Sequence, residues 1–83
     1  MNSPENLEEY VREIMSKDDL KDFKETSTDD LLMYHHGLGT ELRNHYNLWD
    51  EEELKKYISE IEHYHPDDLS YMWIVNLHRK LNN

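Results

Sequence analysis

Apolar positions recur along most of the chain at intervals of three and four residues, the spacing of one face of an α-helix. The first such stripe consists of Leu7, Tyr10, Val11 and Ile14. Ser3 and Pro4 precede it, and this pair is typical of a helix start because Pro at the first helical position gives up an amide that would have no partner. The pattern predicts a helix that begins at Pro4.

Three further helix starts can be identified from polar residues placed just before apolar stripes. Ser16 with Asp19 forms a capping box that opens a short helix carrying Leu20 and Phe23. Asp50 with Glu53 forms a second box, and a helix with the stripe Leu54, Tyr57, Ile58 and Ile61 follows it. The segment His65-Pro66-Asp67-Asp68 has the form of another start and predicts a last helix that runs to residue 81.

The middle of the chain carries one long apolar stripe, interrupted by two glycines. The stripe begins after a start at Ser27 or Thr28, with Asp29 and Asp30 at the positive end of the helix dipole, and consists of Leu31, His35, Leu38, Leu42, Tyr46 and Trp49. Gly37 and Gly39 each cost roughly 1 kcal/mol against Ala in a helix interior. Because the stripe keeps its helical phase through both, we predict one continuous helix, with another helix approaching closely at the glycines.

The charge distribution indicates which helices lie at the centre. Residues 1–30 have a net charge of −6 and residues 50–62 of −4, whereas residues 31–49 and 63–83 each sum to zero. The two neutral segments also hold all six histidines, both tryptophans and both glycines. No strand alternation appears, and 83 residues provide for one small core. We predict a single all-α domain over residues 1–83, a bundle of about five helices with the third and fifth central.

The net charge of −10 disfavours several function classes. It repels nucleic-acid phosphates and anionic lipid, so no direct nucleic acid binding is expected. No apolar run is long enough for a membrane span, and the N-terminus lacks the regions of a signal peptide. Without cysteine there is neither a disulfide nor a thiolate zinc site. We expect a cytoplasmic monomer with no membrane association.

Four sequence elements resemble the signature of a known family. His35-x-Gly-Leu-Gly-x-x-Leu-Arg43-Asn44 is followed by Leu48-Trp49, by His65-Pro-Asp-Asp-Leu-Ser70 and by a closing His-Arg-x-Leu-Asn. This signature is similar to that of a bacterial and phage family catalogued only as a domain of unknown function, over roughly residues 29–82. The resemblance implies a site at these motifs but no particular chemistry.

The motif residues predict a junction between the third and fifth helices. Arg43 is the only Lys or Arg between Lys24 and Lys55, so its partner is expected outside its own helix, at Asp67 or Asp68. The junction is either an Arg–carboxylate clamp or a pocket that accepts an anionic or amide group. The candidate residues are His35, Arg43, Asn44, His65, Asp67 and Asp68.

Metal and catalytic alternatives involve the same region. His63, His65 and Asp67 are of the types that ligate zinc or iron, but their spacing matches no tight motif. Ser70 with His65 is the one candidate pair of nucleophile and base. We expect no metal, no cofactor and no enzymatic activity. If several histidines are buried and neutral in the central pair, stability should fall as the pH decreases through about 6.5.

The remaining candidate surface is acidic. The solvent side of the first helix is predicted to present Glu5, Glu8, Glu9 and Glu13, and a second cluster consists of Asp50, Glu51, Glu52 and Glu53. Such carboxylates are either a solvated face or the means to occupy a basic groove. The sequence therefore predicts a protein-binding module that associates stoichiometrically with a basic partner, such as an inhibitor or mimic directed at a nucleic-acid-binding protein in phage or bacterial defence and counter-defence. The alternative is a small-ligand or metal site at the junction.

Overall fold

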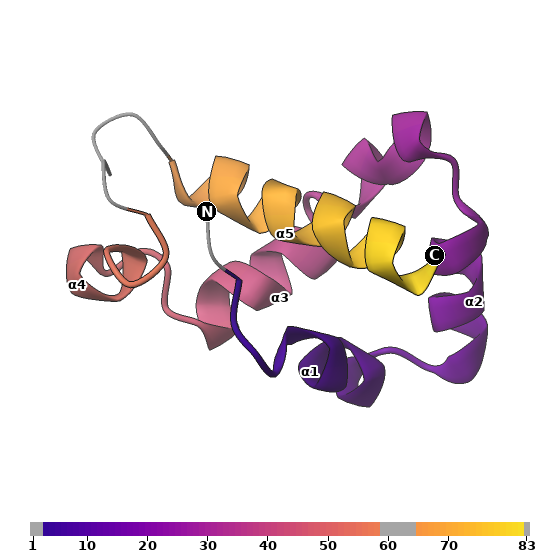
Figure 1. The fold of residues 1–83 in the computed structure, drawn as a ribbon, viewed down its shortest axis with the longest axis horizontal. Coiled ribbons are helices and arrows are strands. Elements are labelled where there is room, and N and C mark those ends of the chain that lie inside the picture. Colours follow the sequence, from indigo (N-terminus) through magenta and orange to yellow (C-terminus); the bar gives the residue numbers. More distant parts are fainter. Residues whose placement is uncertain (1–2, 59–64, 83) are drawn as a thin grey trace.

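The computed structural model describes residues 3–58 and 65–82, and its regular elements within these ranges are all helices (Figure 1). The predicted all-α class is therefore confirmed. In chain order the elements are α1 (Leu7–Ile14), α2 (Lys17–Glu25), the 3₁₀ helix η1 (Thr28–Tyr34), α3 (Leu38–His45), α4 (Glu51–Leu54) and α5 (Pro66–Leu81).

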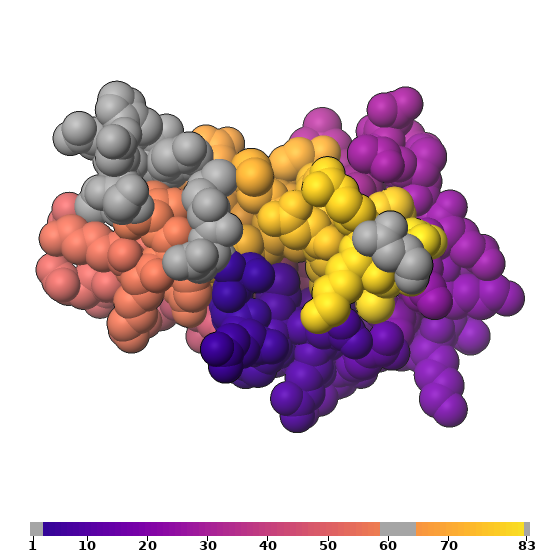
Figure 2. Space-filling model, viewed as in Figure 1, coloured from indigo at the N-terminus to yellow at the C-terminus, as the bar shows by residue number. Residues whose placement is uncertain are grey.

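Helix α5 is the element on which most of the others pack. Its contacts with α3 are the most extensive, followed by those with η1 and α2. Figure 2 shows α5 crossing this face of the molecule, with α1 along one side, α4 at one end, and η1 and α2 at the other. Leu69, Trp73, Ile74 and Leu77 of α5 are buried. The prediction that the third and fifth helices form the centre is confirmed.

Two of the predicted helix starts hold as written. The Ser16 hydroxyl accepts a hydrogen bond from the Asp19 amide at 3.1 Å, which is one of the two hydrogen bonds of a capping box. His65 caps α5 through Nδ1, which accepts from the Asp67 amide at 3.2 Å, and Pro66 is the first helical residue.

The first helix begins later than the Ser3-Pro4 pair predicts. The Pro4 carbonyl accepts from the amide of Leu7 at 3.2 Å, which closes a turn before α1, and Asn6 occupies the cap position. The Asn6 side chain accepts instead from the Tyr46 hydroxyl at 2.9 Å. The predicted start at Pro4 is therefore wrong by three residues, because Pro4 forms this turn rather than the first helical turn.

The prediction of one continuous helix through both glycines is wrong. The 3₁₀ helix η1 ends at Tyr34, a turn follows, and α3 begins at Leu38 with Gly37 as its cap residue. A Cβ at Gly37 would meet no atom of the described residues within 4 Å, so none of the described helices approaches there. The break falls at Gly37, and glycine has a low propensity for the helix interior. A 3₁₀ helix has three residues per turn, so Leu31 is buried while Leu32 and its neighbour Met33 face solvent.

Helix α3 ends in a Schellman motif, and as a result Leu48 is buried instead of Trp49. Asn47 has a positive φ of 54°, its amide donates to the Asn44 carbonyl, and the amide of Leu48 donates to the Arg43 carbonyl at 2.9 Å. Leu48 is fully buried, whereas Trp49, predicted to continue the buried stripe, is 58% exposed. The left-handed residue redirects the chain, so the helical phase of the stripe does not extend beyond it.

Helix α4 is shorter than the apolar stripe predicts. It covers only Glu51–Leu54 and is followed by a turn, although Leu54 and Ile58 are both buried. Asp50 accepts from the Glu52 amide at 2.8 Å rather than from Glu53, so the predicted capping box is not formed. The predicted positions Ile61 and His63 lie outside the described residues. Among the described helices, none is long and apolar enough to cross a membrane.

Candidate functional site

The Arg43 side chain is buried where α3, η1 and α5 meet, with only 5% of the residue exposed. Its Nη1 donates to the hydroxyl of Ser70 on α5 at 2.9 Å. Its Nη2 donates to the Thr40 hydroxyl at 2.9 Å and to the backbone carbonyl of His35 at 3.3 Å. One guanidinium therefore connects α3, the turn before it and the first turns of α5.

Asp67 supplies the opposite charge. Its Oδ1 lies 3.1 Å from Nε of Arg43, and this contact is an ion pair in which the N–H is not aligned for a hydrogen bond. The prediction that Arg43 pairs with Asp67 or Asp68 is confirmed for Asp67, whose side chain is 38% exposed. The side chain of Asp68 is exposed on the same helical turn and lies outside this cluster.

Ser70 has a role at the junction that the sequence did not indicate. The residue is fully buried, and its hydroxyl accepts from Arg43 and donates to the Asp67 carbonyl at 3.0 Å. Its hydrogen bonds therefore run to these two residues rather than to His65, the base considered for it. The T-x-x-R and D-x-x-S spacings of Thr40 and Ser70 were available as signals for these local contacts.

Two histidines flank the Asp67 carboxylate. Oδ2 of Asp67 lies 3.5 Å from Nδ1 of His65 and 3.9 Å from Nε2 of His35. Nδ1 of His35 is buried with no hydrogen-bond partner among residues 3–58 and 65–82, and the exposed ring of Trp49 lies 5.8 Å from that of His65. Asn44, the remaining predicted junction residue, is exposed.

The junction leaves little hydrogen-bonding capacity for a ligand. A guanidinium has five N–H donors, and three of those on Arg43 are bonded within the protein while a fourth faces Asp67. The arrangement has the geometry of the Arg–carboxylate clamp. It links α3 to α5 by groups that are largely withdrawn from solvent.

Metal ligation finds no support within residues 3–58 and 65–82, where no three His, Asp or Glu side chains are placed to hold an ion. His65 and Asp67 adjoin each other, whereas His63 of the predicted set lies outside the described residues.

The hypothesis of several buried neutral histidines is wrong for the five that the structure describes. His36, His45 and His65 are exposed, and His35 and His78 are half-buried. Nε2 of His78 lies 2.7 Å from the Thr26 carbonyl oxygen, and the ring of His45 stacks on Tyr10 at a centroid distance of 3.7 Å. The histidines thus pack at the edge of the core rather than inside it.

Of the four carboxylates predicted for the first helix, Glu8, Glu9 and Glu13 lie on α1, whereas Glu5 lies in the turn before it. One of the four is paired and three are not. Glu8 lies 3.1 Å from Nε of Arg12 and 3.4 Å from Nζ of Lys80, and hydrogen bonding to Arg12 is the main cause that lowers the pKa of Glu8. Glu5, Glu9 and Glu13 are exposed, and within the described residues they form no ion pair. We call these three side chains the α1 carboxylate face.

The acidic cluster around α4 is largely engaged within the protein. Asp50 caps the helix, Glu52 lies 3.5 Å from Nζ of Lys55, and Glu53 lies 2.9 Å from Nζ of Lys56. Only Glu51 remains exposed without such a contact in the described part of the chain. Two of the four predicted carboxylates are therefore offset by neighbouring lysines.

The chain belongs to a family described as a domain of unknown function, DUF6794, whose match spans residues 3–81. The resemblance to an uncharacterised family is confirmed at this level. The searches of curated proteins and of solved structures find no match.

Proposed function

We propose that this DUF6794 protein is a small acidic protein-binding module that associates stoichiometrically with a basic surface on a partner. The observation that carries the proposal is the α1 carboxylate face. Glu9 and Glu13 are four residues apart on α1 and share one side of the helix, and exposed Glu5 lies in the turn just before α1. Their exposure, with no ion-pair partner among the described residues, leaves them available to lysines and arginines of another protein on a chain of net charge −10.

The Arg43 junction and the α4 acidic cluster have fewer groups available to bind a partner. Arg43 has most of its donors engaged with Ser70, Thr40, His35 and Asp67, which argues against a junction pocket for an anion or amide. The α4 cluster is partly offset by Lys55 and Lys56. The proposed contact surface therefore centres on α1. In the described part of the chain, Glu51 is the carboxylate of the α4 cluster that neither caps the helix nor pairs with a lysine.

The partner class follows from the chemistry of the carboxylates. Carboxylates one helical turn apart, about 6 Å, can engage basic side chains that otherwise hold phosphates. The narrower form of the proposal is an inhibitor or mimic directed at a basic nucleic-acid-binding protein, of the kind that phages and bacteria use in defence and counter-defence.

The test is affinity capture from lysate with a variant matched in charge. The tagged wild type is compared with Glu5→Gln/Glu9→Gln/Glu13→Gln and with the control Asp18→Asn/Glu25→Gln/Asp29→Asn, which removes three other exposed charges. Capture is measured at about 0.1 M and about 1 M salt, where the screening length falls from about 10 Å to about 3 Å.

We expect one partner to be captured stoichiometrically by the wild type and by the control at low salt. The α1 variant should lose it, and so should the wild type at high salt. Equal capture by all three proteins, or capture of no partner, would contradict the proposal.

A further inference from the structure

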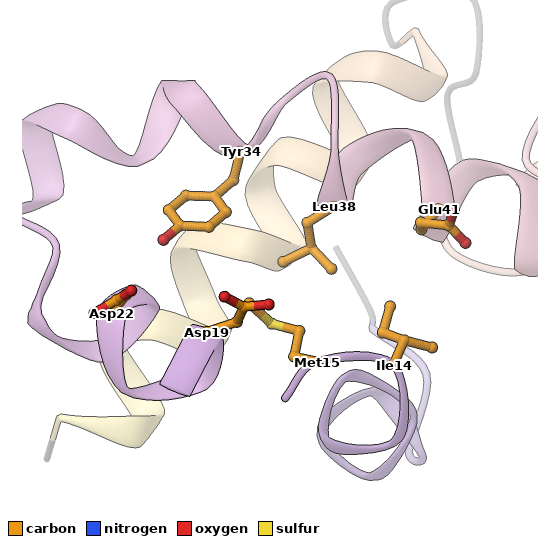
Figure 3. A pocket seen from close by; sticks show the side chains of 7 residues that line it. All are labelled: Ile14, Met15, Asp19, Asp22, Tyr34, Leu38 and Glu41. Atoms are coloured by element: carbon orange, nitrogen blue, oxygen red, sulfur yellow. The ribbon is translucent and has the colours of Figure 1, made fainter. Parts of the chain in front are cut away.

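A groove lies between the end of α1, α2, η1 and α3, outside the junction described above (Figure 3). Its volume is about 450 Å³, within the range of about 300–1,000 Å³ that is common for ligand sites. The residues that line it are Ile14, Met15, Asp19, Asp22, Tyr34, Leu38 and Glu41.

The apolar part of the groove lining consists of Ile14, Met15, Leu38 and the ring of Tyr34. In Figure 3 Leu38 points across the groove toward Met15, whereas the Tyr34 hydroxyl points toward the side of Asp22. Ile14 is 41% exposed, although it belongs to the apolar stripe of α1. The Tyr34 ring is held in place by an edge-to-face contact with buried Phe23, at a centroid distance of 5.0 Å. The groove is thus already formed in the folded chain, and the apolar side chain of Ile14 is exposed in it.

All charged side chains that line the groove are acidic. Asp19 and Asp22 come from α2 and Glu41 comes from the first turn of α3. The backbone groups of the two aspartates are used for capping, in contacts with Ser16 and Thr26, whereas their carboxylates form no ion pair within the described residues. Glu41 lies at the end of the groove near Ile14, and Asp22 lies at the other end beside Tyr34 (Figure 3).

One residue of the α1 carboxylate face is next to the groove in the chain, because Glu13 directly precedes Ile14, which lines the groove. Tyr10 has a raised pKa because of burial first, and then because of the negative charges of Glu41 and Glu13. The basic side chains of α2 do not line this groove. They line a separate hollow, together with Leu20 and Arg12 of α1: Lys17, Lys21 and Lys24.

We propose that this groove is the docking site for a partner segment that presents an apolar side chain flanked by lysine or arginine. The apolar side chain would cover Ile14 and contact Leu38, while the basic side chains would face Asp19, Asp22 and Glu41. Charge complementarity selects this occupant, because the groove presents negative charge around an apolar floor and repels phosphate and acidic peptides. The inference rests on the proposed binding function, and it assigns the groove as the place where an apolar side chain of the partner binds.

The experiment selects binders from a displayed library of random peptides of about 16 residues on the full wild-type chain. One enriched peptide is synthesised with a fluorescent label and titrated by anisotropy. The groove variant is Asp19→Asn/Asp22→Asn/Glu41→Gln, which keeps side-chain shape, and Ile14→Ser tests the apolar contact at an exposed position. The variant Asp18→Asn/Glu25→Gln/Asp29→Asn described above is the matched control, because these exposed residues do not line the groove. The α1 variant is titrated alongside, and thermal melts establish that each variant is folded.

Enrichment of peptides with an apolar residue within one helical turn of Lys or Arg is the expected result. The groove variant should bind the selected peptide about tenfold more weakly, in keeping with the loss of three exposed charge pairs. Ile14→Ser should also weaken binding severalfold while the melting temperature stays within a few degrees of the wild type.

The inference is overturned if no such peptides are enriched, or if they bind the groove variant as tightly as the wild type. A peptide that is lost only with the α1 variant also overturns it, while leaving the proposed function intact. Conversely, groove-dependent peptide binding together with failed capture from lysate would remove the proposed partner function and retain the groove as a peptide site.

Discussion

A Cβ atom at Gly39 would lie 2.9 Å from Nη1 of Arg43, one turn further along α3. Real Cβ atoms essentially never stand that close to another heavy atom, so any side chain at position 39 must displace the guanidinium. Glycine was expected to admit a neighbouring helix. It admits instead the side chain of its own helix, which then reaches Ser70 on α5.

Gly39→Ala should therefore destabilise the protein, although alanine is the better helix former by roughly 1 kcal/mol. Displacement of Arg43 weakens a buried hydrogen bond to Ser70 and the neighbouring ion pair, so we expect a net loss of about 1–2 kcal/mol. Urea unfolding followed by circular dichroism measures the free energy. In an Arg43→Met background the same substitution should be neutral or stabilising; an equal loss in both backgrounds would refute the steric link.

Asp67→Asn should cost more stability than Asp68→Asn. Both carboxylates are in the first turn of α5 and lose the same favourable interaction with the helix dipole, but only Asp67 faces buried Arg43. Because Asp67 is partly exposed, we expect a difference of about 1 kcal/mol rather than the larger cost of breaking a fully buried pair. Chemical denaturation of the two variants side by side is the measurement. Equal midpoints would mean that the pair contributes nothing.

Tyr46 should make the protein sensitive to alkaline pH. Burial raises the pKa of Tyr46 to about 12 from an ordinary value of 10.0. Between these values the unfolded chain releases the phenolic proton while the folded chain retains it, so the free energy of unfolding is unaffected below pH 10 and decreases as the pH rises toward 12.

Tyr46→Phe should reduce this alkaline slope. Urea titrations at about one-unit intervals from pH 9 to pH 12 would compare the variant with the wild type. Part of the slope should remain, because burial is also the main cause that raises the pKa of Tyr10 and of Tyr57. Identical slopes in the two proteins would show that Tyr46 is not the titrating group.

Asn47 should tolerate glycine but not alanine. Its φ of 54° lies in the left-handed region, which costs an ordinary residue roughly 1–2 kcal/mol and glycine almost nothing. We expect Asn47→Ala to lose about 1 kcal/mol and Asn47→Gly to stay within about 0.5 kcal/mol of the wild type. Thermal or urea unfolding resolves these values, and an alanine variant as stable as the glycine variant would be inconsistent with the backbone conformation.

The sequence predicted those elements whose ends are determined by local chemistry. Ser16 and His65 cap their helices through contacts within three residues, so the cap motif identified α2 and α5 directly. The Arg43–Asp67 pair was also predictable, since no other Lys or Arg occurs between Lys24 and Lys55 and an arginine on a neutral helix needs a carboxylate.

Other features depend on backbone geometry that cannot be predicted from the spacing of apolar residues. The apolar stripe stays in phase across Gly37, yet the backbone leaves the helix there and resumes at Leu38. Asn47 followed by Leu48 is a recognisable Schellman ending, and applying it would have assigned burial to Leu48 instead of Trp49.

The groove could not be predicted, because four separate elements supply its lining residues and only their packing brings Ile14 and Leu38 together. The sequence pattern predicted that both residues belong to apolar helix faces, but it did not predict that these two residues line the same groove.

The central position of α5 also has a consequence for protein synthesis. The helix on which α3, η1 and α2 pack is the last of the described elements to be translated, so these segments lack their main packing surface until residue 81 has left the ribosome. Residues 1–65 carry seventeen Asp and Glu against seven Lys and Arg. That excess of negative charge keeps nascent chains of a polysome apart during the interval before the core can form.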